Sequence, residues 1–256
     1  MLHTQTILAL DGGGTHTRIA LIARDAHVLA HASGPGCNPY DRPEWADNLR
    51  TLLCSVPHTG LRAAVLGMAG YDGARPSSLA QRDVALTALG PDCVLELEND
   101  VQTAHRAAFA GSAGVFVLAG TGSVAQASTQ DGRSAVGNVT PTVLALAHAQ
   151  DPHAMALLQA AGTHLAALAR TACRALATGQ TAPDMPWSYG GSVLHSLFIR
   201  DHVATVLGQA AVSPALPPLG GAALRAAHLA GWEVNTAWVD RLRQTLFPQT
   251  LQNALS

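Results

Sequence analysis

The stretch Asp11-Gly12-Gly13-Gly14-Thr15-His16-Thr17-Arg18 lies between two short runs, 7–10 and 18–23, that are both typical of β-strands. Consecutive glycines allow a tight turn in which backbone N–H groups approach an anion closely, with hydroxyl groups alongside. The pattern therefore predicts a strand–loop–strand turn that binds phosphate. The residues expected to do so are Gly12, Gly13, Gly14, Thr15 and Thr17.

A P-loop is a poor explanation for this turn, because that motif needs a lysine after its glycines and then a helix. The 256-residue chain contains no lysine, so all 15 basic residues are arginines. Backbone amides, hydroxyls and a bound metal ion would have to supply the positive field. Asp11 is the candidate ligand for Mg²⁺, which prefers carboxylates together with phosphate oxygens and water. The alternative role for Asp11 is a turn residue that caps local amides.

Composition excludes several classes of function. With 48% hydrophobic and 12% charged residues and a formal charge of -2, the chain offers no electrostatic attraction for nucleic acid or an anionic membrane. The four cysteines are scattered without a CxxC pair, which argues against a zinc site or an iron–sulfur cluster. No signal-peptide pattern or membrane-length apolar run is present, so we expect a cytoplasmic protein.

Two similar openings organise the chain. Strands are expected over 18–23, 28–33, 61–69 and 94–97, with helices over 43–56, 77–89 and 101–110. After Gly111 a strand, a glycine turn and a second strand recur over 115–128, with further strands over 133–136, 186–189 and 212–216. Helices are expected over 152–177, from Ser192, over 222–230, where Gly220-Gly221 opens the helix, and over 236–255 with a break near Pro248. The recurrence predicts an α/β protein of two domains, 1–110 and 111–256, whose last helix can pack back on the first domain.

Three more turns fall at expected strand ends, where a bound ligand can be reached. They are Asn99-Asp100, the segment Gly120-Thr121-Gly122-Ser123, and Gly190-Gly191-Ser192. Asp100 ends an alternating strand just before a helix, so on its own it is better explained as a helix N-cap. Gly120–Ala125 also fits the dinucleotide fingerprint GxGxxA, but residues 123–127 are typical of a strand, whereas the fingerprint requires a helix at that place.

These segments, in this order, resemble the superfamily of acetate and sugar kinases, heat-shock cognate proteins and actin. Within it, the chain is similar to the BadF/BadG/BcrA/BcrD ATPase family, in the branch that includes N-acetylglucosamine kinase. The segments that carry the resemblance are DGGGTHTR at 11–18, GPGCNPY at 34–40, LGMAGYD at 66–72, LENDVQTA at 97–104, LAGTGS at 118–123, SYGGSV at 188–193 and PPLGGAALRAA at 217–227.

The resemblance implies two ribonuclease H-like domains of the actin/hexokinase-like ATPase fold, each a mixed five-stranded sheet flanked by helices, the C-terminal one truncated. It also implies an ATP- and Mg²⁺-dependent kinase acting on a hydroxyl of N-acetylglucosamine or a related amino sugar, and a homodimer is compatible with it. Asp100 would be the catalytic base, Asn38, Gly70 and Asn99 would contact the sugar beside it, and Asp11 would hold the metal. The remaining glycine turns, Gly120, Thr121, Gly122 and Ser123 and then Gly190, Gly191 and Ser192, would bind ATP.

One departure from the family bears on activity. After residue 134 the relatives continue into a Gly-Asp-Glu-Gly-Ser motif that helps to form the sugar pocket, whereas this chain runs Ala135-Val136-Gly137-Asn138-Val139-Thr140-Pro141 into a helix-forming segment. A second hypothesis is therefore an ATP-binding protein of the same fold that has lost catalysis and serves as a sensor or partner subunit. Asn38 has a structural alternative as well, a simple Asn-Pro turn.

Overall fold

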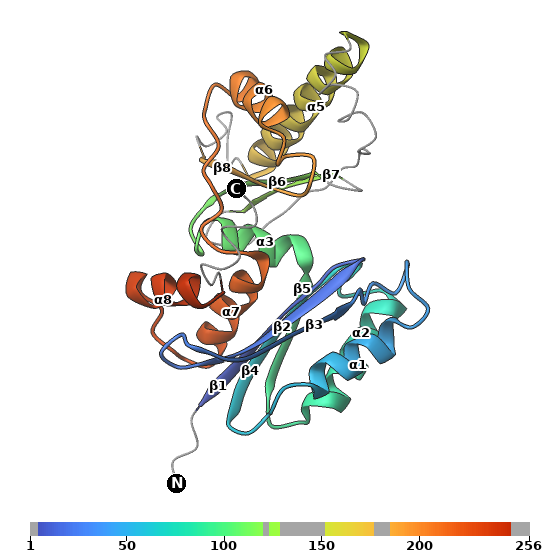
Figure 1. Ribbon diagram of the computed structural model, residues 1–256, viewed down its shortest axis with the longest axis vertical. Coiled ribbons are helices and arrows are strands. Elements are labelled where there is room, and N and C mark those ends of the chain that lie inside the picture. The colour runs from blue at the N-terminus through green and yellow to red at the C-terminus, as the bar shows by residue number, and fades with distance from the viewer. Residues whose placement is uncertain (1–4, 120–122, 129–151, 177–184, 247–256) are drawn as a thin grey trace. The chain divides into compact units, whose positions relative to one another are not determined.

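The computed structural model of this chain describes residues 5–119, 123–128, 152–176 and 185–246 (Figure 1). Its elements are β1 Thr6–Gly12, β2 His16–Ala23, β3 Val28–Pro35, α1 Trp45–Cys54, β4 Leu61–Met68, α2 Pro76–Leu89, β5 Val94–Asn99, α3 Asp100–Ala108, β6 Gly114–Ala119, β7 Ser123–Ser128, α5 Pro152–Leu176, β8 Trp187–Gly190, α6 Leu197–Leu207, α7 Pro218–Leu229 and α8 Thr236–Leu246. The chain forms two compact units, Met1–Ala110 with Ala215–Ser256, and Gly111–Pro214.

The first unit contains a mixed five-stranded sheet in the order β3-β2-β1-β4-β5. Strands β1, β2 and β3 run antiparallel as a meander, and β4 and β5 lie parallel to β1. The glycine turn joins β1 to β2, with Gly12 paired to Thr17, so the predicted strand–loop–strand geometry is confirmed. Strand β2 begins two residues earlier than expected because this pairing extends to the turn itself.

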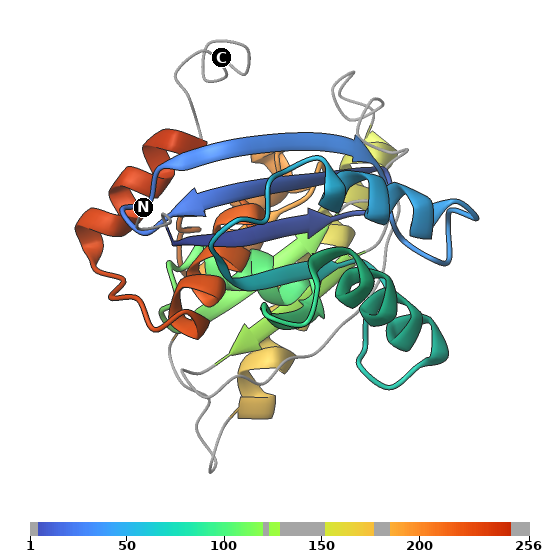
Figure 2. The same cartoon turned by 90° about the horizontal axis from the view of Figure 1, so that it is seen from below.

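Side chains alternate between two buried faces of this sheet. Leu8 and Leu10 face a core that includes residues of α1, whereas Ile7 and Ala9 face a core built with α7 and α8. Figure 2 shows these helices as separate layers on the two sides of the sheet. Burial of both faces explains why the strands are almost continuously apolar.

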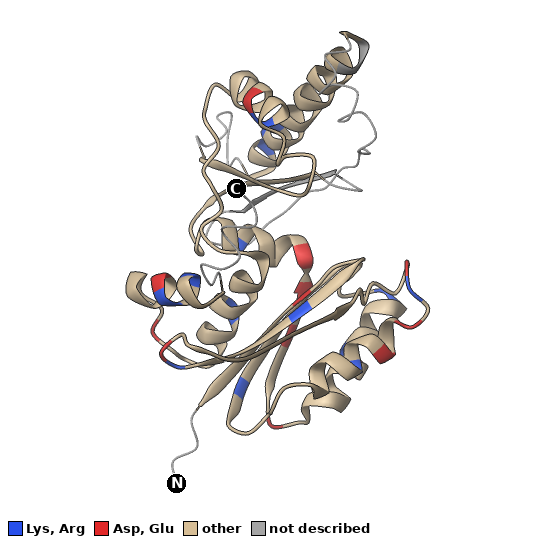
Figure 3. Ribbon diagram, in the orientation of Figure 1, with Lys and Arg blue, Asp and Glu red and all other residues tan. Residues whose placement is uncertain are grey.

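Two arginines tie helices to β5 on the α7 side of the sheet. Glu98 accepts two hydrogen bonds from Arg106 of α3, both 2.6 Å. Glu96 accepts two from Arg225 of α7, both 2.7 Å, and these bonds hold the pKa of Glu96 below its usual range. Figure 3 shows acidic residues along β5 and at the start of α3. Paired, bidentate charges explain how a half-buried strand can carry two carboxylates.

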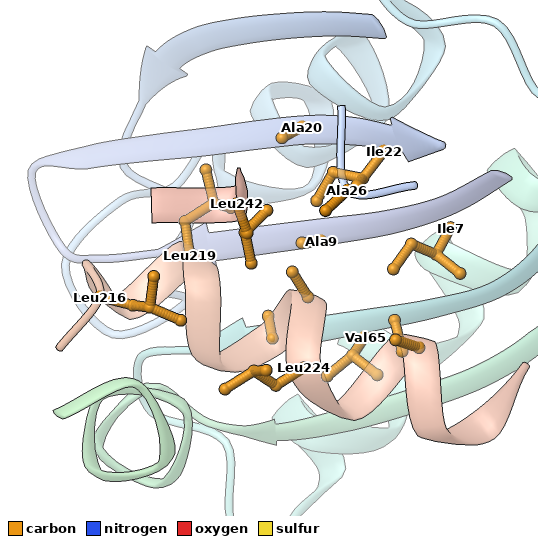
Figure 4. Packing of buried hydrophobic residues seen from close by; sticks show 14 of the residues in the cluster. Ile7, Ala9, Ala20, Ile22, Ala26, Val65, Leu216, Leu219, Leu224 and Leu242 are labelled. Carbon is orange, nitrogen blue, oxygen red and sulfur yellow. The ribbon is translucent and has the colours of Figure 1, made fainter. Parts of the chain in front are cut away.

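Helix α7 belongs to the first unit although it lies more than a hundred residues away from that unit's sheet in sequence. Leu219 and Leu224 of this helix pack with Ile7 and Val65 of the strands (Figure 4). The chain thus divides not only at residue 111 but also after Pro214, where it returns to the first unit. Gly220-Gly221 was expected to open a helix at Ala222, whereas α7 begins at Pro218 and includes both glycines.

The second unit contains, in its described part, a three-stranded sheet in the order β7-β6-β8. Strand β7 is antiparallel and β8 parallel to β6, and α5 and α6 contribute to one apolar core with β6. The expected strand 133–136 and the break near Pro248 lie outside the described residues. The expected strand 212–216 was wrong, because only the bridge from Ser188 to Val212 forms. No helix in the part of the chain that the structure describes combines the length and apolarity needed to span a membrane.

Close packing of α7 against α3 gives a test of this arrangement. A Cβ atom at Gly221 would lie 1.9 Å from the carbonyl oxygen of Thr103, so Gly221→Ala must push the two helices apart. We expect it to lower the free energy of unfolding by about 2 kcal/mol, even though alanine favours helix by about 1 kcal/mol over glycine. Urea unfolding followed by tryptophan fluorescence and circular dichroism measures this change.

The matched control is Gly162→Ala in α5, where the nearest atom is Cδ2 of the His202 ring, 2.7 Å away. Because a side chain can shift more easily than backbone, we expect a much smaller loss there. Equal effects of the two substitutions would contradict the close approach of α7 to α3.

Candidate functional site

The carboxyl ends of three parallel strands meet at one edge of the first unit's sheet. Residues Asp11, Gly67 and Glu98 are neighbours across β1, β4 and β5, and Gly12 lies beside Met68. The residue after the end of β5 is Asp100, the first of α3. This topology brings the glycine turn and Asp100 to the same edge, although Gly12 and Asp100 lie far apart in the sequence.

Asp11 is a partly buried carboxylate whose negative charge is only weakly neutralised by a neighbouring cation. Its side chain is 16% exposed, and its nearest cation is Arg18, whose Nη1 lies 3.8 Å from Oδ2. The pKa of Asp11 is raised to about 6. Burial is the largest cause; the charge of Arg18 lowers the pKa, and the charge of Asp100 raises it. A bound cation would relieve both the burial and the repulsion from Asp100.

Asp100 lies in the first turn of α3 without being its N-cap. The cap is Asn99, whose Oδ1 accepts from the amide of Val101 at 3.0 Å, while Gln102 Oε1 accepts from the Asn99 amide at 3.0 Å. This capping box satisfies the helix start. Burial raises the pKa of Asp100, opposed by its hydrogen bond from the amide of Val101. The N-cap is therefore Asn99 and not Asp100, although the Asp100 carboxylate also accepts from the Val101 amide.

At the tip of the glycine turn, one backbone amide is hydrogen-bonded within the turn and two others are not hydrogen-bonded to any described residue. The amide of Gly13 donates to the carbonyl of His16 at 3.0 Å, whereas the amides of Gly14 and Thr15 have no hydrogen-bond partner among the described residues. Thr15 is exposed, but Thr17 is 1% exposed and its hydroxyl donates to Cys37 Sγ at 3.2 Å. The structure thus places the Thr15 hydroxyl at the surface of the turn and the Thr17 hydroxyl inside the core.

The expected sugar-contacting residues gather at the same edge. Gly70 has φ of +76°, and a Cβ atom there would lie 2.8 Å from Asn38 Oδ1. Asn99 Nδ2 donates to the carbonyl of Tyr71 at 3.0 Å, which joins the end of β5 to this loop. Asn38 is also engaged within its own loop, since Oδ1 accepts from the amide of Tyr40 and Nδ2 donates to Asp41.

The described turn of the second unit is held against β6. Gly191 has φ of +83°, a Cβ atom there would lie 2.2 Å from the Ala119 carbonyl oxygen, and that oxygen accepts from Val193 N at 3.0 Å. This turn replaces the helix expected from Ser192, and α6 begins only at Leu197. Gly190 is the last residue of β8.

The second expected phosphate turn lies mostly outside the described residues, namely at Gly120, Thr121 and Gly122. Ser123 begins β7, which pairs antiparallel with β6. A strand at this place confirms the prediction made against a dinucleotide fingerprint, which requires a helix there.

Sequence reasoning missed two arginines at this edge. Arg18 lies opposite Asp11 in the β1–β2 register, and the spacing across the hairpin could have revealed the pair. Arg42 donates from Nε to the carbonyl of Gly14 at 3.2 Å. This is a contact between two loops, which no sequence pattern predicts.

Among the described residues, no three His, Cys, Asp or Glu side chains gather as a protein-only metal site. Mg²⁺ does not need one, since it commonly binds one or two carboxylates together with phosphate oxygens and water. Asp11 fits such a role, because the pKa of its carboxyl group stays raised even with Arg18 at 3.8 Å, so a bound cation would stabilise its charged form.

Comparisons with solved structures agree with this architecture, whereas no family model and no curated protein matches the chain. A candidate N-acetylglucosamine kinase from Chromobacterium violaceum superposes with a TM-score of 0.69 and 22% identity, over 89% of this chain and 99% of that one. A second candidate N-acetylglucosamine kinase, from Porphyromonas gingivalis, gives 0.62 and 20% identity over 87% and 98%. A ROK family glucokinase from Streptomyces griseus, in complex with glucose and AMPPNP, gives 0.58 and 15% over 87% and 98%. The chain therefore shares the mixed α/β fold of these solved structures.

The raised pKa of Asp11 has a consequence for stability. An acid whose folded pKa lies above its unfolded value of 3.8 costs the fold stability as pH rises through the interval from about 4 to about 6. Asp11→Asn removes this cost, so we expect the variant to be more stable than the wild type by up to about 3 kcal/mol above about pH 7. The difference should vanish below about pH 4, as measured by urea unfolding across the pH range.

The control is Asp92→Asn, an exposed carboxylate at which we expect little change at any pH. An Asp11→Asn variant that is less stable than the wild type at neutral pH would show that Arg18 outweighs burial.

Proposed function

We propose that this protein is an ATP-dependent sugar kinase that phosphorylates a hydroxyl of N-acetylglucosamine or a related amino sugar. The observation that carries the proposal is the proximity of two partly buried carboxylates, Asp11 and Asp100, to a glycine turn whose Gly14 and Thr15 amides have no hydrogen-bond partner among the described residues. The shared fold supports it, since candidate N-acetylglucosamine kinases and a glucokinase have that fold. Fold alone would not suffice, because one fold hosts many functions.

Asp100 would accept the proton of the attacking hydroxyl. Its raised pKa suits this task, because a base is most effective when its pKa approaches the working pH. The amides of Gly14 and Thr15 would bind phosphate oxygens, and Asp11 would hold Mg²⁺, which neutralises charge on the phosphates. Asn38, Gly70 and Asn99 would line the sugar side.

The nucleotide side of the proposal rests on the second unit. Gly120, Thr121, Gly122 and Ser123 would form the second phosphate turn, and Gly190, Gly191 and Ser192 would approach the adenosine. We further propose membership of the BadF/BadG/BcrA/BcrD branch, with ribonuclease H-like domains of which the C-terminal one is truncated. The resemblance of the sequence segments supports this finer assignment.

A second candidate function is an ATP-binding protein without catalysis, acting as a sensor or partner subunit. Two observations favour it. The Gly-Asp-Glu-Gly-Ser segment is absent from the sequence, and the Asn38 amide is hydrogen-bonded within its own loop. Because orientation of the acceptor supplies much of the rate in phosphoryl transfer, a reshaped acceptor site can abolish turnover while ATP binding persists.

The test is ADP release, coupled to a spectroscopic readout, with Mg-ATP and each of N-acetylglucosamine, glucosamine, glucose and N-acetylmuramic acid. We expect one of these sugars to stimulate ADP release, and we expect Asp100→Asn to reduce that stimulated rate by at least about 100-fold. The affinity for Mg-ATP, measured by calorimetry, should change less than about twofold, because the carboxamide keeps the shape of the side chain.

Asp92→Asn is the matched control and should leave both quantities unchanged. ATP binding without stimulation by any sugar would favour the sensor, and failure to bind ATP would rule out both candidates. Equal loss of binding and turnover in Asp100→Asn would mean that Asp100 is not the base.

A further inference from the structure

The loop between β3 and α1 donates hydrogen bonds to the carbonyl groups at the tip of the glycine turn. Three donors of this loop, residues 36–42, bind three consecutive carbonyls of the tip. The amide of Cys37 donates to Gly13 O at 3.3 Å, Arg42 Nε donates to Gly14 O at 3.2 Å, and the amide of Gly36 donates to Thr15 O at 2.9 Å.

Planarity of the peptide bond turns these contacts into an orientation of the amides. In a trans peptide the C=O of one residue and the N–H of the next point in opposite directions, and the described chain contains no cis peptide. Holding the Gly13 carbonyl therefore aims the Gly14 amide away from the loop. Holding the Gly14 carbonyl does the same for the amide of Thr15.

We propose that Arg42 is the positioning residue of the anion-binding turn, fixing the Gly14–Thr15 peptide so that its amide faces a nucleotide polyphosphate. The inference rests on the proposed function and names a residue that binds no phosphate itself. Of the three loop contacts to the tip carbonyls, only the one from Arg42 comes from a side chain. It also contacts the peptide at the centre of the turn, which no backbone donor reaches among the described residues.

The charges around Arg42 favour positioning over direct contact with phosphate. The Asp41 carboxylate lies on the same loop, with Oδ2 only 3.0 Å from where a Cβ of Gly14 would be. An anion in contact with the Arg42 side chain would be close to this carboxylate of the neighbouring residue, whereas the held carbonyls turn the Gly14 and Thr15 amides away from the loop. A chain without lysine can in this way aim backbone dipoles at an anion.

Three substitutions separate the hydrogen bond of Arg42 from its charge. Arg42→Gln places an amide nitrogen at the same number of bonds from Cα as Nε, so it keeps the donor and loses the charge. Arg42→Lys keeps the charge but has a methylene group in place of Nε. Arg42→Ala removes both, and Arg50→Ala, an exposed arginine of α1, is the control.

Calorimetry with Mg-ATP should show about tenfold weaker binding for Arg42→Ala and Arg42→Lys, the scale expected for a lost hydrogen bond from a charged donor. Arg42→Gln and Arg50→Ala should stay within about threefold of the wild type. In ligand-free protein, the amide resonances of Gly14 and Thr15 should shift in Arg42→Ala and return toward the wild-type positions in Arg42→Gln. These spectra also show directly whether each variant is folded.

Retained affinity in Arg42→Lys with loss in Arg42→Gln would overturn positioning in favour of a charge contact. Unchanged affinity in Arg42→Ala, with the wild type binding Mg-ATP, would overturn this inference and leave the proposed kinase standing. A wild-type protein that does not bind Mg-ATP would overturn both together.

Discussion

The position of Asp100 depends on how closely helix α3 approaches its neighbours at Thr103. A Cβ atom at Gly67 of β4 would lie 2.4 Å from Thr103 Oγ1, and one at Gly221 of α7 would lie 1.9 Å from the Thr103 carbonyl oxygen. The same hydroxyl donates to the carbonyl of Asp100 at 2.8 Å. Two glycines on different elements thus let the first turn of α3 settle against the sheet, and Asp100 is carried with it.

The sheet edge formed in this way is electrostatically costly. Asp11 and Asp100 are both partly buried, and this burial raises the pKa of each; the charge of Asp100 adds to the rise at Asp11. By contrast, Glu96 and Glu98 on the same strand each accept two hydrogen bonds from an arginine. Carboxylates that serve structure are paired, while those at the strand ends are left poorly compensated. Strongly perturbed carboxylates at a strand edge are typical of functional sites.

Local patterns were enough to predict the turn and the order of elements in the first half of the chain. Alternation and glycine content defined β1, the turn and β2, because those features are encoded within a few neighbouring residues. Gly220 and Gly221 were predicted to open a helix at Ala222, whereas both lie inside α7 and Gly221 allows the close approach to α3, which is visible only once distant segments pack. For the same reason the sequence could not place α7 in the first unit.

Errors at the site have a similar physical origin. Asp100 and Asn99 are adjacent and both can cap a helix, so only the backbone decides that Asn99 does so. Thr15 and Thr17 look equivalent in the sequence, yet Thr15 lies in the exposed turn before β2, whereas Thr17 lies within β2 and its hydroxyl donates to Cys37 Sγ.

The loop at 36–42 connects two parts of the site that the sequence treats as separate. Asn38 next to Gly70 and Arg42 on the Gly14 carbonyl lie four residues apart on this one loop. Its Arg42 Nε and its backbone amides hold the glycine turn, and the Asn38 side chain shapes the loop itself through Tyr40 and Asp41. A change in the loop's conformation at Asn38 must therefore displace the hydrogen-bond donors that bind the carbonyls of the turn. The proposed acceptor and phosphate positions would thus be coupled through the covalent chain of this loop.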